Sequence, residues 1–112
     1  MQDMDIAAAK MDRIIWGIDP QFWYKRDNDE LLAIREVLNL GVDDIVLFSP
    51  KMLLPFYNIH IIIDALPLIL EKFPNVKILV SERRELPEYK QQILSQIEAY
   101  DIADHIILVG DI

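Results

Sequence analysis

A pair of adjacent arginines, Arg83 and Arg84, forms a local basic feature on the expected ligand-binding rim. The pair lies in a polar segment, Ser81–Leu86, of a chain whose formal net charge is −8. Guanidinium groups form paired hydrogen bonds with phosphate and carboxylate oxygens, so contact with an anion is the chemistry that this pair could perform. Two solvated side chains on an exposed loop are the alternative interpretation.

Other residue types that perform catalysis or bind metals do not converge. The only histidines, His60 and His105, fall on different expected elements, whereas a metal site needs several ligands together. We expect both to be structural. No nucleophile elbow, GxGxxG fingerprint or P-loop is present, and the chain has no cysteine. The sequence therefore predicts no catalytic residue, no metal site and no cofactor.

Composition and charge limit the class of protein. A length of 112 residues predicts one domain, and the apolar share of 53% predicts a packed core with apolar surface to spare for another domain or another copy. An acidic chain of net charge −8 repels nucleic acid and anionic lipid. The N-terminus lacks the pattern of a secretory signal, and no apolar stretch approaches the ~20 residues of a membrane span. We expect a soluble, cytoplasmic protein.

Short apolar runs alternate with amphipathic stretches, which is typical of a parallel α/β domain. Strands are expected at 45–48, 76–80 and 105–109, with helices at 28–40, 58–73 and 87–100. A further short strand is expected at 13–16, followed by a loop at 18–27 held in place by its aromatic side chains.

Capping residues set the expected ends of two helices. Asp27 or Asn28 can cap the first helix, and Gly41 can end it. Asn58 can cap the second helix. One face of the first helix is expected to be buried, and it consists of Leu31, Leu32, Ile34, Val37, Leu38 and Leu40.

The order of elements predicts a Rossmann-like parallel sheet with a βαβαβ core and right-handed crossovers. In such sheets ligands bind beyond the carboxyl ends of the strands. Loops 49–57, 81–86 and 110–112 should therefore face one rim. The Ser49–Asn58 loop is the expected functional loop.

Three segments of the chain also carry a family resemblance. They are IIWGID (14–19) with Phe22, VLFSPKMLLPFYNIHIIIDALPLILEKFPNVKILV (46–80) and IADHIILVG (102–110). Together they resemble family 4 glycosyltransferases, which are retaining enzymes of the GT-B fold. The resemblance implies that residues 1–26 hold the inter-domain turn and short N-terminal elements. Residues 27–112 would then be part of the C-terminal nucleotide-sugar-binding α/β domain.

The resemblance also implies a donor site. In that family the loop after the strand at 45–48 presents an arginine and, five residues later, a lysine to the donor diphosphate. Those positions fall on Met52 and Tyr57 here, and Lys51 could replace the missing arginine. The implied diphosphate-binding residues are Lys51, Met52, Tyr57 and Asn58. The implied nucleotide and sugar contacts along the rim are Gly17, Ser81, Arg83, Val109 and Gly110.

By resemblance, then, the chain is a glycosyltransferase fragment that binds a nucleoside-diphosphate sugar without a metal. It lacks the acceptor domain and the segment with the family's glutamate pair, so we do not expect it to be competent alone. Its partners would be the missing N-terminal and C-terminal parts of the enzyme, or a second copy in a homodimer. The alternatives are a non-catalytic Rossmann-like interaction or oligomerisation module, and a different nucleotide-binding α/β enzyme.

Overall fold

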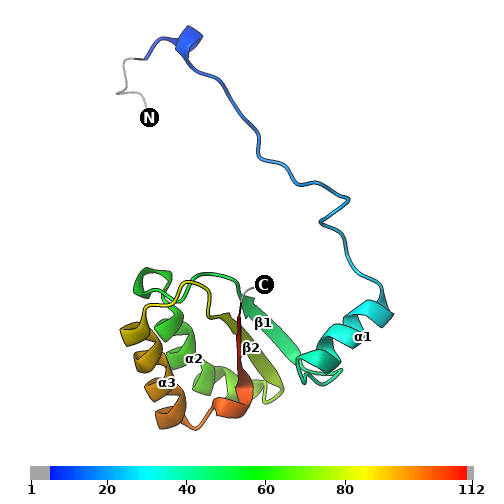
Figure 1. Cartoon of the computed structure of the whole chain (residues 1–112), viewed down its shortest axis with the longest axis vertical. Helices are drawn as coiled ribbons and strands as arrows, with labels where there is room; N and C mark the ends of the chain where they lie inside the picture. Colours follow the sequence, from blue (N-terminus) through cyan, green and yellow to red (C-terminus); the bar gives the residue numbers. More distant parts are fainter. Residues whose placement is uncertain (1–5, 111–112) are drawn as a thin grey trace.

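A computed structural model describes residues 6–110. Its centre is a sheet of three parallel strands in the order β1-β2-β3. The strands are β1 (Ile45–Ser49), β2 (Val76–Ser81) and β3 (Ile106–Val109), connected by helices α2 (Ile59–Lys72) and α3 (Pro87–Tyr100). Both helices lie on the same face of the sheet (Figure 1). The predicted βαβαβ core is therefore confirmed, and the fold is a Rossmann-like α/β arrangement.

The core lies between the sheet and these two helices. Side chains of β2 alternate between the two faces, so Val76, Ile78 and Val80 point toward the helices and each is at most 3% exposed. They pack with Ile59, Ile63, Leu66, Tyr89, Ile93 and Ile97. Burying one such aliphatic side chain contributes about 1.5–3 kcal/mol, which explains why the apolar runs form this layer.

The opposite face of the sheet is open within residues 6–110. Lys77, Leu79 and Ser81 alternate onto it, and Phe48 pairs with Leu79 in the register of β1 and β2. Phe48 is 49% exposed, whereas Leu79 in the central strand is 8% exposed. The open face therefore presents apolar side chains near the carboxyl ends of the strands.

Helix α1 (Asn28–Val37) begins where the sequence predicted. The Asp27 carboxylate accepts a hydrogen bond from the Glu30 N–H at 2.9 Å, which is the expected cap. The predicted end at Gly41 is wrong. Asn39 adopts the left-handed conformation, with φ of 55°, and ends the helix earlier, because asparagine tolerates this region better than most residues.

The expected buried face of α1 is also wrong. No residue of α1 is buried, and Val37 is 85% exposed. The Arg35 guanidinium donates to the carbonyl oxygens of Gly41 at 2.7 Å and Asp44 at 3.2 Å, which fixes the helix beside the start of β1. An amphipathic pattern shows which face of a helix can be buried, but burial requires a partner surface, and the described residues place none against α1.

The N-terminal segment also differs from expectation. The predicted strand at 13–16 is absent, and Trp16 is 96% exposed. A strand forms only where another strand supplies hydrogen-bond partners, and the segment runs away from the sheet (Figure 1). The loop at 18–27 is not held by its aromatic residues, because Phe22 is 74% exposed and Trp23 is 69% exposed. The radius of gyration, 19.2 Å, exceeds the ~13 Å of a compact chain of this length for the same reason.

The start of α2 is built differently from the prediction. Asn58 precedes the helix as expected, but it is left-handed, with φ of 59°, and its side chain makes no capping hydrogen bond. The short 3-10 helix η2 (Pro55–Tyr57) leads into this residue, and the Asn58 carbonyl oxygen accepts from the Ile61 N–H at 3.1 Å. The side chain of Asn58 is consequently not used to begin α2.

None of the helices in the described range has both the length and the apolar character that crossing a bilayer requires.

Candidate functional site

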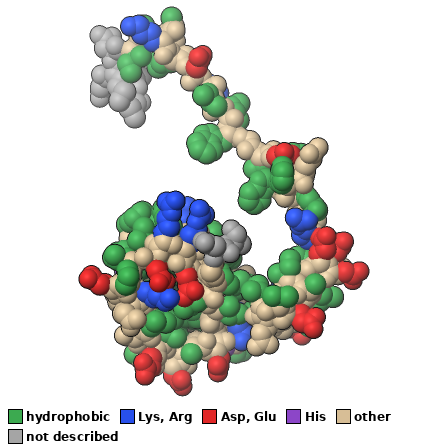
Figure 2. Space-filling model, in the orientation of Figure 1, with side chains coloured by type: hydrophobic (Ala, Val, Ile, Leu, Met, Phe, Trp, Pro, Cys, Tyr) green, Lys and Arg blue, Asp and Glu red, His purple; other side chains and the backbone are tan. Residues whose placement is uncertain are grey.

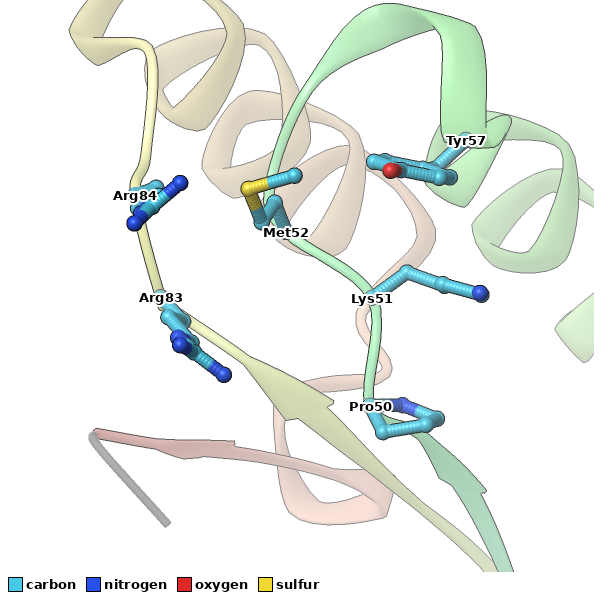
Figure 3. A pocket seen from close by; sticks show the side chains of 6 residues that line it. All are labelled: Pro50, Lys51, Met52, Tyr57, Arg83 and Arg84. Carbon is cyan, nitrogen blue, oxygen red and sulfur yellow. The ribbon is translucent and has the colours of Figure 1, made fainter.

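A cavity opens beyond the carboxyl ends of β1 and β2, between the loops that follow these strands. It has a volume of about 230 Å³, and we call it the rim cavity. Its lining residues are Pro50, Lys51, Met52, Tyr57, Arg83 and Arg84 (Figure 3). Three of them are cationic, and no carboxylate of the described residues lines the cavity. Such a lining favours an anionic ligand.

Backbone hydrogen bonds join the two loops that form the walls. The Leu53 N–H donates to the Arg83 carbonyl oxygen at 3.2 Å, and the Leu86 N–H donates to the Leu53 carbonyl oxygen at 3.2 Å. The Leu53 side chain is fully buried in the core. The cations of both loops are therefore attached to backbone that the core holds in place.

The acidic residues of the loop after β2 do not line the rim cavity and are paired with a lysine. The Lys90 ammonium on α3 lies 2.9 Å from the Glu85 carboxylate and 3.0 Å from that of Glu82. These hydrogen bonds, from Glu85 first and then Glu82, raise the pKa of Lys90 above its usual value. Within residues 6–110 neither Arg83 nor Arg84 forms a salt bridge, so their charges remain directed at the cavity.

The backbone conformation of the loop after β2 positions Arg83 and Arg84 at the rim cavity. The Ser81 side chain is 1% exposed, and its hydroxyl oxygen accepts from the Arg83 N–H at 3.2 Å. Arg84 adopts a left-handed conformation, with φ of 47°. This conformation costs a non-glycine residue about 1–2 kcal/mol, and residues held in it cluster at functional sites.

Lys51 lies apart from the arginines. Its ammonium is 5.6 Å from the centroid of the Tyr57 ring. Figure 3 shows the Lys51 side chain running away from Arg83 and Arg84, while the Met52 side chain lies between Arg84 and Tyr57. Exposed cation–π contacts are worth about 0.5–1 kcal/mol, so rotating the lysine toward an anion in the cavity has a small cost.

The charge distribution of the molecule agrees with an anion site at this end. Figure 2 shows Lys and Arg side chains gathered at the end of the body where the strands finish, and Asp and Glu side chains mostly at the opposite end and over α1. In a chain of net charge −8, this separation gives the rim cavity a local sign opposite to that of the whole molecule.

Most of the predicted diphosphate-binding residues come together. Lys51, Met52 and Tyr57 all line the rim cavity, whereas Asn58 stays at the start of α2. Arg83, which was predicted as a nucleotide or sugar contact, lines the same cavity. Pro50 and Arg84 also line the cavity, and the family resemblance implied neither of them. The signal for Arg84 was present in the sequence, because it is the second member of the basic pair.

Of the other residues predicted for the rim, all but Gly17 lie at the carboxyl end of the sheet. Ser81 lines a second, neighbouring cavity. The Val109 carbonyl oxygen accepts from the Glu82 N–H at 2.8 Å, and Gly110 follows β3 at the same end of the sheet. Gly17 is not brought to either cavity, because it lies in the exposed N-terminal segment with no atom within 4 Å of the space a Cβ would occupy.

Both histidines contact partners inside the fold. The backbone N–H of His60 donates to the Tyr89 hydroxyl oxygen at 2.9 Å, and the Tyr89 hydroxyl lies 2.7 Å from Nδ1 of the His60 ring. His105 Nδ1 lies 3.0 Å from the Val76 carbonyl oxygen, to which it donates when protonated. These contacts give each imidazole a structural role.

Comparison with known proteins gave no match: no protein-family model fits the chain, and neither curated proteins nor solved structures matched it.

Proposed function

We propose that the rim cavity binds the diphosphate of a nucleoside-diphosphate sugar, and that the chain is part of the donor-binding domain of a glycosyltransferase. One observation carries the proposal: Lys51, Arg83 and Arg84 line one cavity at the carboxyl ends of parallel strands, in a chain of net charge −8. Ligands of open parallel sheets bind at this end. The resemblance to family 4 glycosyltransferases supports the choice of ligand.

The side chains offer complementary contacts to a diphosphate. Each arginine presents a planar fork that matches two phosphate oxygens, and Lys51 supplies a mobile point charge. When the glycosyl group is transferred to an acceptor, the bond to the diphosphate breaks and the leaving group gains negative charge. Cations already placed around it stabilise that charge. In this proposal the chain's own contribution is donor binding and leaving-group stabilisation.

In the proposed site most of the positive charge comes from the loop after β2. In the family the cations come from the loop after β1, where this chain has Met52 and Tyr57. Here Arg83 and Arg84 approach from the loop after β2, on the other side of the cavity (Figure 3). The two positions face the same space, so we infer that these arginines take over the contacts to phosphate.

Isothermal titration with UDP-, GDP- and ADP-sugars tests the proposal. We expect binding by at least one of them, weakened about tenfold or more by Arg83→Gln, because a hydrogen bond to a charged group contributes about 1.5–3 kcal/mol. Lys51→Ala should weaken binding less, since its ammonium starts outside the arginine pair. Affinity should also fall as salt rises.

Lys72→Ala is the matched control. Lys72 is exposed at the last turn of α2, and its loss changes net charge as much as Lys51→Ala does. Because α2 runs back along the sheet, its last turn lies at the end opposite the rim cavity. Absence of binding at millimolar nucleotide sugar, or equal weakening by Lys72→Ala and Arg83→Gln, would contradict the proposal.

A second candidate function is self-association without catalysis. The outer side of β1 has no strand partner among the described residues, and an edge strand of this kind can pair with another chain. An apolar groove of about 330 Å³ follows this edge, lined mainly by Leu47, Phe48, Ile61, Ile62, Ala65 and Ile69. A second copy related by a two-fold axis would cover both. Light scattering that gives a monomer mass across concentrations would exclude this function.

A further inference from the structure

A second cavity adjoins the rim cavity on the open face of the sheet. It has a volume of about 280 Å³ and is lined by Trp23, Phe48, Pro50, Ser81 and Arg83. We call it the aromatic cavity. Pro50 and Arg83 line both cavities, so a single ligand can occupy the two together.

Flat apolar surfaces distinguish the aromatic cavity from its neighbour. The Trp23 and Phe48 side chains are 69% and 49% exposed, so their rings remain accessible to a ligand. They come from separate parts of the chain, the segment before α1 and the strand β1. Aromatic side chains exposed beside a charged cavity favour a planar ring that carries an anionic group.

Polar groups at the floor of the aromatic cavity add a means of orientation. The Ser81 hydroxyl oxygen accepts from the Arg83 N–H, which leaves the hydroxyl hydrogen free for an acceptor on a ligand. The Arg83 guanidinium can stack on a ring as well as bind phosphate oxygens. One arginine is therefore placed at the junction between a charged subsite and an aromatic one.

We propose that the aromatic cavity binds the base of a nucleotide by stacking on Trp23, while the phosphates of the same molecule occupy the rim cavity. This inference rests on the proposed anion site and specifies the ligand further. It differs from what the family resemblance implies, which places the base against backbone groups after β3. Here the N-terminal segment supplies the stacking ring.

The two tryptophans of the chain allow a direct test. Trp16 is 96% exposed and lines neither cavity, so Trp16→Phe leaves Trp23 as the only indole and serves as the background for every measurement. This protein is titrated with inorganic pyrophosphate, UDP and ADP, by calorimetry and by tryptophan fluorescence. Circular dichroism checks that each variant is folded.

We expect the nucleotides to bind about 5- to 150-fold more tightly than pyrophosphate and to change Trp23 fluorescence, because stacking on one aromatic ring contributes about 1–3 kcal/mol. Trp23→Ala should remove this advantage and leave pyrophosphate affinity within about twofold. Trp23→Phe should keep part of it, since a smaller ring still stacks.

The outcomes separate this inference from the proposed function. Binding of pyrophosphate with no nucleotide advantage, or an advantage that survives Trp23→Ala, would overturn the base site and leave the anion site intact. Binding of neither pyrophosphate nor nucleotide would overturn the anion site and the base site together.

Discussion

The backbone of Leu53, whose side chain is buried in the core, is hydrogen-bonded to the backbone of Arg83. Leu53 is fully buried in the core, and its N–H donates to the Arg83 carbonyl oxygen at 3.2 Å. A core residue in the loop after β1 thus positions a cation in the loop after β2. The site and the core are therefore coupled through the backbone of Leu53.

Leu53→Ala should lower both stability and anion affinity. Removing a buried leucine side chain costs about 2–5 kcal/mol, and the cavity it leaves lets the two loops separate. Urea denaturation should show the loss of stability, and titration with pyrophosphate in the cold should show weaker binding by the folded protein. Leu53→Met preserves most of the volume and should cost less than about 1.5 kcal/mol. Equal stability of the alanine variant and the wild type would contradict the role of Leu53.

Arg84 can be tested by separating its charge from its backbone conformation. Arg84→Ala and Arg84→Gly lose the same guanidinium, so both should weaken pyrophosphate binding to the same extent. They differ in strain, because only glycine adopts a left-handed φ near 47° at no cost. We expect the glycine variant to be more stable than the alanine variant by about 1 kcal/mol. Thermal or urea unfolding measures the difference, and an alanine variant as stable as the glycine variant would contradict the strained conformation.

Lys90→Gln should weaken anion binding although Lys90 does not line the rim cavity. The substitution frees the carboxylates of Glu82 and Glu85, which then lie in the same loop as the arginines without a cationic partner. We expect pyrophosphate to bind about twofold to fivefold more weakly at low salt, with the difference shrinking as salt rises. Lys72→Gln, the same change at the opposite end, should have no such effect. A Lys90→Gln protein with wild-type affinity at low salt would show that the pairing does not matter.

The hydrogen bond between Tyr100 and Asp64 predicts a dependence of stability on pH. The Tyr100 hydroxyl donates to the Asp64 carboxylate at 2.7 Å, and this contact raises the pKa of Tyr100 above its usual value of 10.0. A raised pKa in the folded state means that the folded protein holds this proton more tightly than the unfolded chain. The contribution is therefore complete below about pH 10 and disappears as pH rises through the folded pKa.

Tyr100→Phe removes this contribution. Wild type should be slightly more stable than the variant from neutral pH to about pH 10, and the difference should vanish at more alkaline pH. Urea unfolding of both proteins across this range measures the difference directly. A difference that stays constant or grows above pH 10 would contradict the assignment.

The strands and the two packed helices could be predicted because their signals are local. Continuous apolar runs such as Ile45–Phe48 mark strands of a parallel sheet, and Pro87 marks the first turn of α3. The predictions that failed depend on a partner elsewhere in the chain. The segment 13–16 has the composition of a strand, but no strand pairs with it, and the apolar face of α1 meets no surface in the described residues.

The location of the candidate site could be predicted from the sequence, but some of its contacts could not. The rule that ligands bind at the carboxyl ends of parallel strands located Lys51 and Arg83 at one end of the sheet. The pairing of Lys90 with Glu82 and Glu85 could not be predicted, because it depends on how the loop is oriented over α3. The place of Trp23 was not predicted either, since nothing local indicates that its side chain lines a cavity with Phe48 and Arg83.

The position of β2 between β1 and β3 has a consequence for how the site responds to a ligand. Amide groups of the central strand are paired on both sides, so they should exchange with deuterium more slowly than those of β1, which has a single neighbour in the described sheet. The arginines lie in the loop after the central strand, and Lys51 lies in the loop after the edge strand. The strand that leads to the arginines is thus held on both sides and the strand that leads to Lys51 on one, and ligands of different size would be accommodated mainly by rotation of the Lys51 side chain.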